Sequence, residues 1–181
     1  MHLWALTKWK KYYNAHIKCR QGLRTRFDPD IDPDLREACL RFCRWVRQEY
    51  FFPIRVNMYF KKAKYIKAKD GDMVSATFLG PYDKMSEPYI RVATGDYIEL
   101  KAHYGRDDAI ASILHSIAHE LSHYFQWVND VQLTKIGEER QATVYARAIL
   151  EYFFEECEPE MFERLYHKKS TYSEENPQSD E

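Results

Sequence analysis

A histidine and glutamate pattern in the C-terminal half of the chain carries the strongest chemical signal. His119, Glu120 and His123 form an HExxH motif within a stretch of helical periodicity. At 3.6 residues per turn, the two imidazoles lie about 6 Å apart on one side of a helix, so both can reach one metal ion. Glu120 lies on the adjacent face, where a carboxylate can reach the ion's bound water and act as a general base.

The two faces of this predicted helix differ in character. The apolar face carries Ile110, Ile113, Ile117, Leu121, Tyr124 and Val128. The opposite face carries Ser112, His115, Ser116, His119, His123 and Gln126. The first face is typical of a buried core face, and the second gathers imidazole and hydroxyl groups. We therefore expect a metal site rather than a structural histidine pair on a solvated surface.

A catalytic zinc ion needs a third protein ligand and an open position for water. Glu138 and Glu139 stand at the start of the next predicted helix, which runs from about Thr134 or Glu138 to Cys157. Their positions on that helix do not separate the two glutamates. The pattern therefore predicts one Zn²⁺ per chain, held by both imidazoles of the motif and one of these carboxylates.

Two motifs together resemble the ImmA/IrrE family of gluzincin metallopeptidases. They are HELSHYFQ, which begins at His119, and ERQATVYARAIL, which begins at Glu139. That family pairs HExxH with a downstream helix of the form ExxANxFAxxLL, and the similarity covers about residues 53–155. The resemblance implies that Glu139 is the third ligand, with Glu138 as the fallback. It also implies limited cleavage of a regulatory protein such as a DNA-binding repressor.

The chain departs from this family pattern at Thr143, where the family usually has Asn. That position steadies the first histidine ligand, so we expect the Thr143 hydroxyl to hold the imidazole less firmly. The family's Met-Pro after the paired leucines is also absent, because Glu151 and Tyr152 follow Leu150.

The donor that would stabilise an oxyanion has no sequence signature of its own. His115 lies one helical turn before His119, and it is a candidate for this role or for a polar residue packed beside the site. His103 and Tyr104, in a predicted loop before the metal helix, are further candidates.

The segment before the metal helix predicts a small mixed or antiparallel sheet. Apolar and polar residues alternate over 54–61, and two further strands are expected over 74–79 and 88–94. We expect the last of these to be an edge strand that pairs with an extended substrate. Its pairing residues would be Tyr89, Ile90, Arg91, Val92 and Ala93.

The N-terminal part predicts helices. Asp32 can cap a helix that has Pro33 at its first position and ends before Pro53. The first 27 residues contain seven basic residues and no acidic one, and we expect an amphipathic helix with a solvated basic face. The basic residues are Lys8, Lys10, Lys11, Lys18, Arg20, Arg24 and Arg26.

Composition bounds the remaining choices. The chain has 181 residues, 27 basic against 28 acidic, and no apolar run near the roughly 20 residues of a membrane helix. No secretory signal pattern is present and the four cysteines suggest no disulfide framework, so we expect a reduced, cytoplasmic protein without membrane contact. We predict one domain over 1–169, comprising N-terminal helices over 1–50 and a catalytic core over 53–157, and a disordered acidic tail over 170–181.

These patterns predict an α+β fold, and the resemblance implies a minimal zincin or gluzincin domain. Its sheet would pack on the HExxH helix and the Glu-bearing helix, with extra N-terminal helices. The leading hypothesis is a zinc metalloendopeptidase that acts on a regulatory or repressor-like protein, without direct nucleic-acid contact. The alternative is a non-catalytic, metal-stabilised module that contacts nucleic acid or protein through its basic N-terminal helix.

Overall fold

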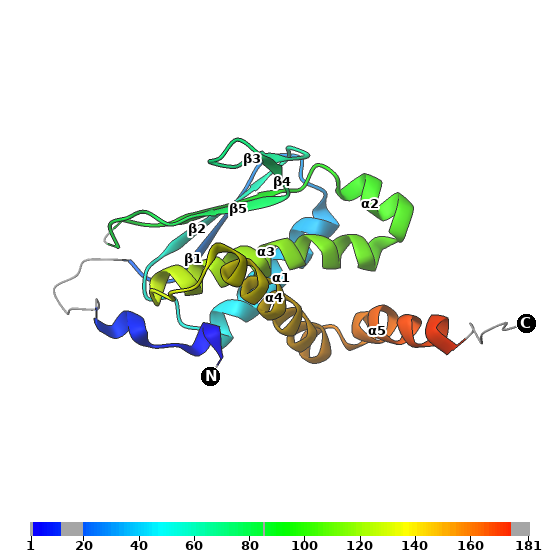
Figure 1. Cartoon of the computed structure of the whole chain (residues 1–181). Helices are drawn as coiled ribbons and strands as arrows, with labels where there is room; N and C mark the ends of the chain where they lie inside the picture. The colour runs from blue at the N-terminus through cyan, green and yellow to red at the C-terminus, as the bar shows by residue number, and fades with distance from the viewer. Residues whose placement is uncertain (1, 12–19, 85, 175–181) are drawn as a thin grey trace, which may run out of the picture.

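A computed structural model describes residues 2–11, 20–84 and 86–174, with side chains as far as Tyr166. The fold is mixed α and β, with a small sheet above a layer of helices (Figure 1). In chain order the elements are η1 (Leu3–Ala5), η2 (Lys8–Lys11), β1 (Leu23–Phe27), α1 (Pro33–Glu49), β2 (Val56–Lys61), β3 (Ile66–Lys67), β4 (Met73–Val74), β5 (Ala76–Leu79), β6 (Tyr89–Ala93), α2 (Tyr97–Tyr104), α3 (Arg106–Val128), α4 (Lys135–Cys157) and α5 (Pro159–Glu174).

The main sheet has the strand order β1-β2-β6-β5. The first three strands are parallel, and β5 runs antiparallel to β6 at one edge. The predicted edge strand was therefore wrong: Tyr89, Ile90, Arg91, Val92 and Ala93 form β6, which lies between two partners. The physical reason is that strand order depends on long-range pairing, so the strand nearest the metal helix in sequence is not at the edge in space.

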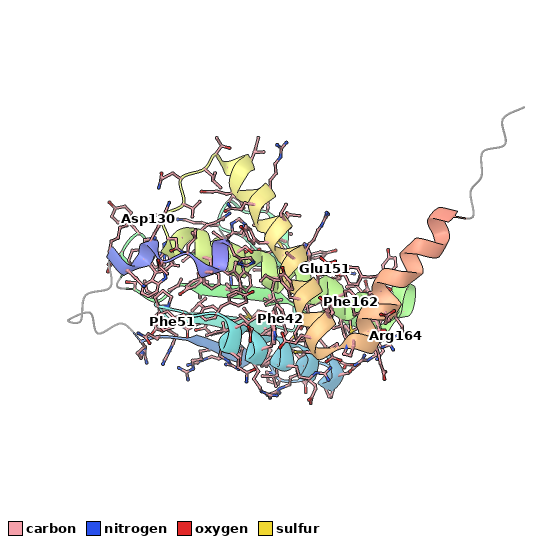
Figure 2. All side chains as sticks on the ribbon, turned by 90° about the horizontal axis from the view of Figure 1, so that it is seen from below. Phe42, Phe51, Asp130, Glu151, Phe162 and Arg164 are labelled. Atoms are coloured by element: carbon pink, nitrogen blue, oxygen red, sulfur yellow. The ribbon has the colours of Figure 1, made fainter. Side chains whose placement is uncertain are left out.

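Helix α1 joins the parallel strands β1 and β2 and covers one face of the sheet. The Asp32 carboxylate accepts hydrogen bonds from the backbone N–H groups of Asp34 and Leu35, and Pro33 is the first helical residue, which confirms the predicted cap. Seen from below, α4 runs obliquely to α1 and meets it at its C-terminal part, where the Phe42 and Phe153 ring centroids lie 5.1 Å apart (Figure 2). This helical layer buries the inward face of the sheet.

The two long helices that carry the motifs pack closely on each other. The apolar face of α3 is buried in the core, as predicted, and α4 is capped by the Thr134 hydroxyl, which accepts from the N–H of Gly137. Ala142 and Ala146 are fully buried on α4. Because these side chains are small, the two helices can approach closely, and this brings the start of α4 to the HExxH turn.

The N-terminal segment packs against α3. Leu3 and Trp4 are buried, and the Trp4 indole N–H donates to Ser122 Oγ at 3.0 Å. The predicted amphipathic helix was wrong for the described part, which forms two short 3-10 turns and the strand β1. In β1 the alternation of apolar and basic residues favours a strand, because Leu23 faces the core while Arg24 and Arg26 face solvent. Residues 12–19, which include Lys18 and Cys19, lie outside the described residues.

Two further helices were not predicted. Helix α2 forms where a loop was expected, and α5 follows α4 and runs to Glu174. The predicted tail is thus helical over 170–174, and its remainder, 175–181, lies outside the described residues. Within the part of the chain that the structure describes, no helix is long and apolar enough to cross a membrane. Cys39 and Cys43 are buried free thiols, whereas Cys157 is exposed.

Candidate metal centre and cleft

Three side chains converge at the HExxH turn of α3. The Nε2 atoms of His119 and His123 lie 3.1 Å apart. Glu139 Oε2 lies 3.2 Å from His119 Nε2, and Glu139 Oε1 lies 3.4 Å from His123 Nε2. Tetrahedral zinc with bonds of about 2.0–2.2 Å separates its ligand atoms by roughly 3.3–3.6 Å. The donor types and spacing therefore fit three ligands of one zinc ion.

The structure separates the two candidate glutamates. Glu139 reaches both imidazoles, whereas Glu138 lines the same cleft beside them. Among the described residues, His119, His123 and Glu139 are the one group of three or more His, Cys, Asp or Glu side chains whose ligand atoms gather in this way. This is the arrangement expected from the sequence.

Gln126 fixes the orientation of one imidazole. Its amide N–H groups donate to the Glu138 carbonyl at 2.9 Å and to Gln141 Oε1 at 3.1 Å. The amide oxygen therefore faces His123 Nδ1, 2.7 Å away, and an oxygen can only accept. This contact calls for the proton of His123 on Nδ1, which leaves Nε2, the atom that faces Glu139, as the nitrogen that can bind a metal.

The surroundings also set the protonation of the motif. Burial raises the pKa of Glu120 to about 7, a hydrogen bond from the Phe78 backbone opposes the rise, and the Glu139 charge adds to it. Burial, and then the nearby His123, lowers the pKa of His119. The motif thus combines a neutral imidazole with a carboxyl group that can exchange a proton near neutral pH.

A cleft of about 810 Å³ opens over these side chains. Edge strand β5 forms one wall, and α3, the start of α4 and the loop between them form the others. Ala93 N–H donates to the Ser75 carbonyl, so by alternation along the antiparallel pair Ala76 and Phe78 turn their backbone groups away from β6. This outward edge explains how Phe78 N–H reaches Glu120 on α3.

Trp127 forms part of the cleft wall and was not predicted as a site residue. Its indole N–H donates to the Pro81 carbonyl at 3.0 Å, and its ring lies against Gly80, where an added Cβ would come within 2.5 Å. Lys84 lies 4.1 Å from the ring centroid and 3.1 Å from Asp130. No local sequence pattern predicts these contacts, because they join segments that are far apart in the sequence.

Two of the other residues predicted to assist the site, His115 and Thr143, do line the cleft. His115 lines the cleft, with its ring centroid 6.4 Å from that of His119. Thr143 also lines the cleft, but its hydroxyl donates to the Glu139 carbonyl at 3.0 Å. Among the described residues no hydrogen bond joins Thr143 to either imidazole of the motif, and it is Gln126 that contacts Nδ1 of His123.

His103 and Tyr104 were wrong as site candidates. Both lie on α2, where they are exposed, and His103 Nδ1 contacts the Glu99 carbonyl of the same helix. They line a groove with Lys64 that is separate from the cleft over the motif. The physical reason is that α2 replaces the expected loop and places these residues at its exposed C-terminal turn.

Comparisons with known proteins gave no match: no family model matches this chain, and neither a curated protein nor a solved structure does. The function proposed below therefore rests on the residues of this chain and on their geometry.

Proposed function

We propose that the chain is a zinc-dependent metalloendopeptidase of the HExxH gluzincin type. The observation that carries this proposal is the convergence of His119, His123 and Glu139 beside the buried carboxyl of Glu120 at the floor of a cleft. The resemblance of HELSHYFQ and ERQATVYARAIL to the ImmA/IrrE family, and the α+β layers around them, support the same assignment.

His119, His123 and Glu139 would hold the ion. When bound, zinc supplies a Lewis acid that polarises a carbonyl and lowers the pKa of water towards about 7. Gln126 keeps the proton of His123 on Nδ1, so that Nε2 remains a donor atom. The fit of the ligand triangle and of this tautomer supports a metal with nitrogen and oxygen ligands.

Glu120 would move the proton. Its carboxylate takes a proton from the attacking water and returns it to the leaving amine. Burial favours the protonated form of Glu120 once it has taken that proton, and the hydrogen bond from Phe78 N–H favours the ionised form before the transfer. The two effects together place the pKa of this group near neutrality, where transfer in both directions is efficient.

Edge strand β5 would position the substrate. The outward N–H and C=O of Ala76 and the C=O of Phe78 can pair with an extended peptide laid along the cleft. This role replaces the one predicted for Tyr89–Ala93, which has partners on both sides. A substrate that pairs in this way must be extended, which favours a locally unfolded segment of a regulatory protein, such as the repressor that the family resemblance implies.

The alternative, a non-catalytic module that binds through a basic N-terminal helix, has less support. The described N-terminal residues form short 3-10 turns in place of that helix. A structural metal site also has no use for a carboxyl group buried beside the ligands, as Glu120 is.

One substitution separates metal binding from catalysis. Glu120→Gln should retain zinc but lose peptide hydrolysis by about 10²- to 10⁴-fold, because it removes the proton carrier and no ligand. Glu151→Gln, the same change on the exposed part of α4, is the matched control and should retain both. Zinc is measured by elemental mass spectrometry, and cleavage by mass spectrometry of new N-termini in a denatured protein mixture. Equal cleavage by wild type and Glu120→Gln, or no zinc-dependent cleavage by wild type, would contradict the proposal.

A further inference from the structure

The face of the main sheet turned away from α1 and α3 has a regular composition. Alternation along the strands buries residues such as Met58 and Phe60 and turns their neighbours outward. The strand register places the outward residues in two rows across the sheet. One row is Arg26, Tyr59, Arg91 and Thr77, and the other is Arg24, Asn57, Tyr89 and Leu79. We call these eight residues the open face; Figure 1 shows the helices on the other side of the sheet.

Aromatic rings and guanidinium groups contact one another on the open face. The Tyr59 and Tyr89 ring centroids lie 6.4 Å apart in an edge-to-face arrangement. The Arg26 guanidinium lies 6.0 Å from the Tyr59 ring centroid, and that of Arg91 lies 6.0 Å from the Tyr89 ring centroid. Both tyrosines are half-buried, so part of each residue remains accessible to solvent beside the cations.

The charge of the open face has one sign. It carries Arg24, Arg26 and Arg91 and no acidic residue. Arg24 and Arg26 are exposed, and no carboxylate among the described residues pairs with them. The nearby acids pair with other groups: Asp28 with Lys61, and Glu87 with Arg20 and with the Asn57 amide of the open face, which donates to Glu87 Oε2 at 2.8 Å.

We propose that the open face binds single-stranded nucleic acid. A surface whose exposed Arg24 and Arg26 have no carboxylate partner among the described residues is complementary to a polyanion, and the half-buried tyrosines beside these cations offer rings on which unpaired bases can stack. Arg24 and Arg26 contact phosphates, and Tyr59 and Tyr89 stack on bases. Bases within a duplex are already stacked on one another, so the arrangement selects a single strand.

The open face and the cleft can be tested separately. Strands β1 and β5 lie at opposite edges of the sheet, and Arg24, Arg26 and Tyr59 are not among the residues that line the cleft. Nucleic-acid binding therefore goes beyond the proposed peptidase activity. Variants of these three residues should leave the zinc content and the cleavage of proteins unchanged.

The test measures fluorescence anisotropy of labelled 12-nucleotide oligothymidylate and oligouridylate at 50 and 200 mM salt. Wild type should bind more tightly at the lower salt concentration. The double variant Arg24→Glu/Arg26→Glu should weaken binding at least tenfold, and removal of two phosphate contacts should reduce the salt slope by about 1.4. Arg44→Glu/Arg140→Glu, the same charge change on exposed positions of α1 and α4, should weaken binding less than threefold.

Tyr59 tests the stacking part of the proposal. Tyr59→Ala should weaken binding by about 5- to 100-fold, whereas Tyr59→Phe keeps the ring and should remain within twofold of wild type.

Preferential binding of one oligonucleotide assigns DNA or RNA as the preferred strand. Three outcomes overturn the proposal: no binding by wild type at 50 mM salt, equal losses in the Arg44/Arg140 control, or equally strong competition by polyglutamate, which would assign an acidic protein segment to the open face.

Discussion

The amide oxygen of Gln126 lies 2.7 Å from Nδ1 of His123, and this bond determines which nitrogen of the imidazole carries the proton. Gln126 is itself held by acceptors on α4, at Glu138 and Gln141. The bond therefore links the histidine ligand on α3 to the first turns of the helix that carries Glu139.

The first prediction concerns this link. Gln126→Leu removes the acceptor from His123 Nδ1 and should lower zinc affinity by about 10- to 100-fold. Thr143→Val has a similar shape but lacks the hydroxyl, and it should stay within about threefold of wild type because that hydroxyl bonds the Glu139 carbonyl. Zinc titration against a competing chelator measures both. A larger loss in Thr143→Val than in Gln126→Leu would restore the role for Thr143 expected from the sequence.

The second prediction concerns the three ligands. His119→Ala, His123→Ala and Glu139→Ala should each remove most of the bound zinc, because each deletes one corner of the ligand triangle. Glu138→Ala is the matched control and should retain about one zinc per chain. Elemental analysis of dialysed protein gives the stoichiometry. If Glu138→Ala lost zinc and Glu139→Ala kept it, the third ligand would be Glu138.

The third prediction concerns the start of the metal helix. The Arg106 guanidinium, 2.7 Å from Asp34 through Nε, holds the pKa of Asp34 below its ordinary value of 3.8. This stabilisation is full above that value and is lost as the pH falls through the lower folded-state pKa. Arg106→Gln should therefore reduce the unfolding free energy by about 1 kcal/mol or less at pH 7, since the pair is partly exposed, and by less at pH 3.

Urea unfolding of metal-free wild type and Arg106→Gln at pH 7, 5 and 3 measures this difference. A difference in unfolding free energy that grows towards pH 3 would show that Asp34 is not the partner through which Arg106 stabilises the fold.

The fourth prediction concerns the cleft wall. Gly80→Ala would place a methyl group 2.5 Å from Trp127, whose ring is held by the bond to the Pro81 carbonyl. The overlap should cost about 1–3 kcal/mol of unfolding free energy. Adding Trp127→Phe, which has a smaller ring, should recover part of the loss. Thermal and denaturant unfolding of the single and double variants tests this, and strictly additive losses would argue against the contact.

Several elements could be predicted because their signals are local. Asp32 and Pro33 mark the start of α1 through side-chain capping and a fixed backbone angle. The apolar stripe of α3 depends on residues within a few turns, and so does the spacing of the HExxH motif. The positions of Glu138 and Glu139 on their helix do not separate them, and the preference for Glu139 comes only from the resemblance of one motif to a family pattern.

The remaining features depend on contacts between distant segments. Strand β6 became an interior strand because β5 pairs with its outer side, and no residue of Tyr89–Ala93 encodes that neighbour. Helix α2 has no clear apolar stripe, since Ile98 and Tyr104 on it are exposed. Strand β1 alternates over only five residues within a basic segment, which hides its period. Gln126 lay on the predicted polar face, but its role needed the position of α4.

The hydrogen bond between Trp4 and Ser122 also sets a timing requirement. Its partners are separated by 118 residues. At ribosomal speeds of about 5–20 residues per second, the Trp4 indole is made roughly 6 to 24 s before Ser122 exists. Until then this large apolar side chain has no native partner on α3, so the metal helix can be braced only late in synthesis. If a protease removed the first few residues during this interval, the ribosome would still synthesise every residue that lines the cleft. The finished chain would nevertheless lack Trp4, which packs against the metal helix.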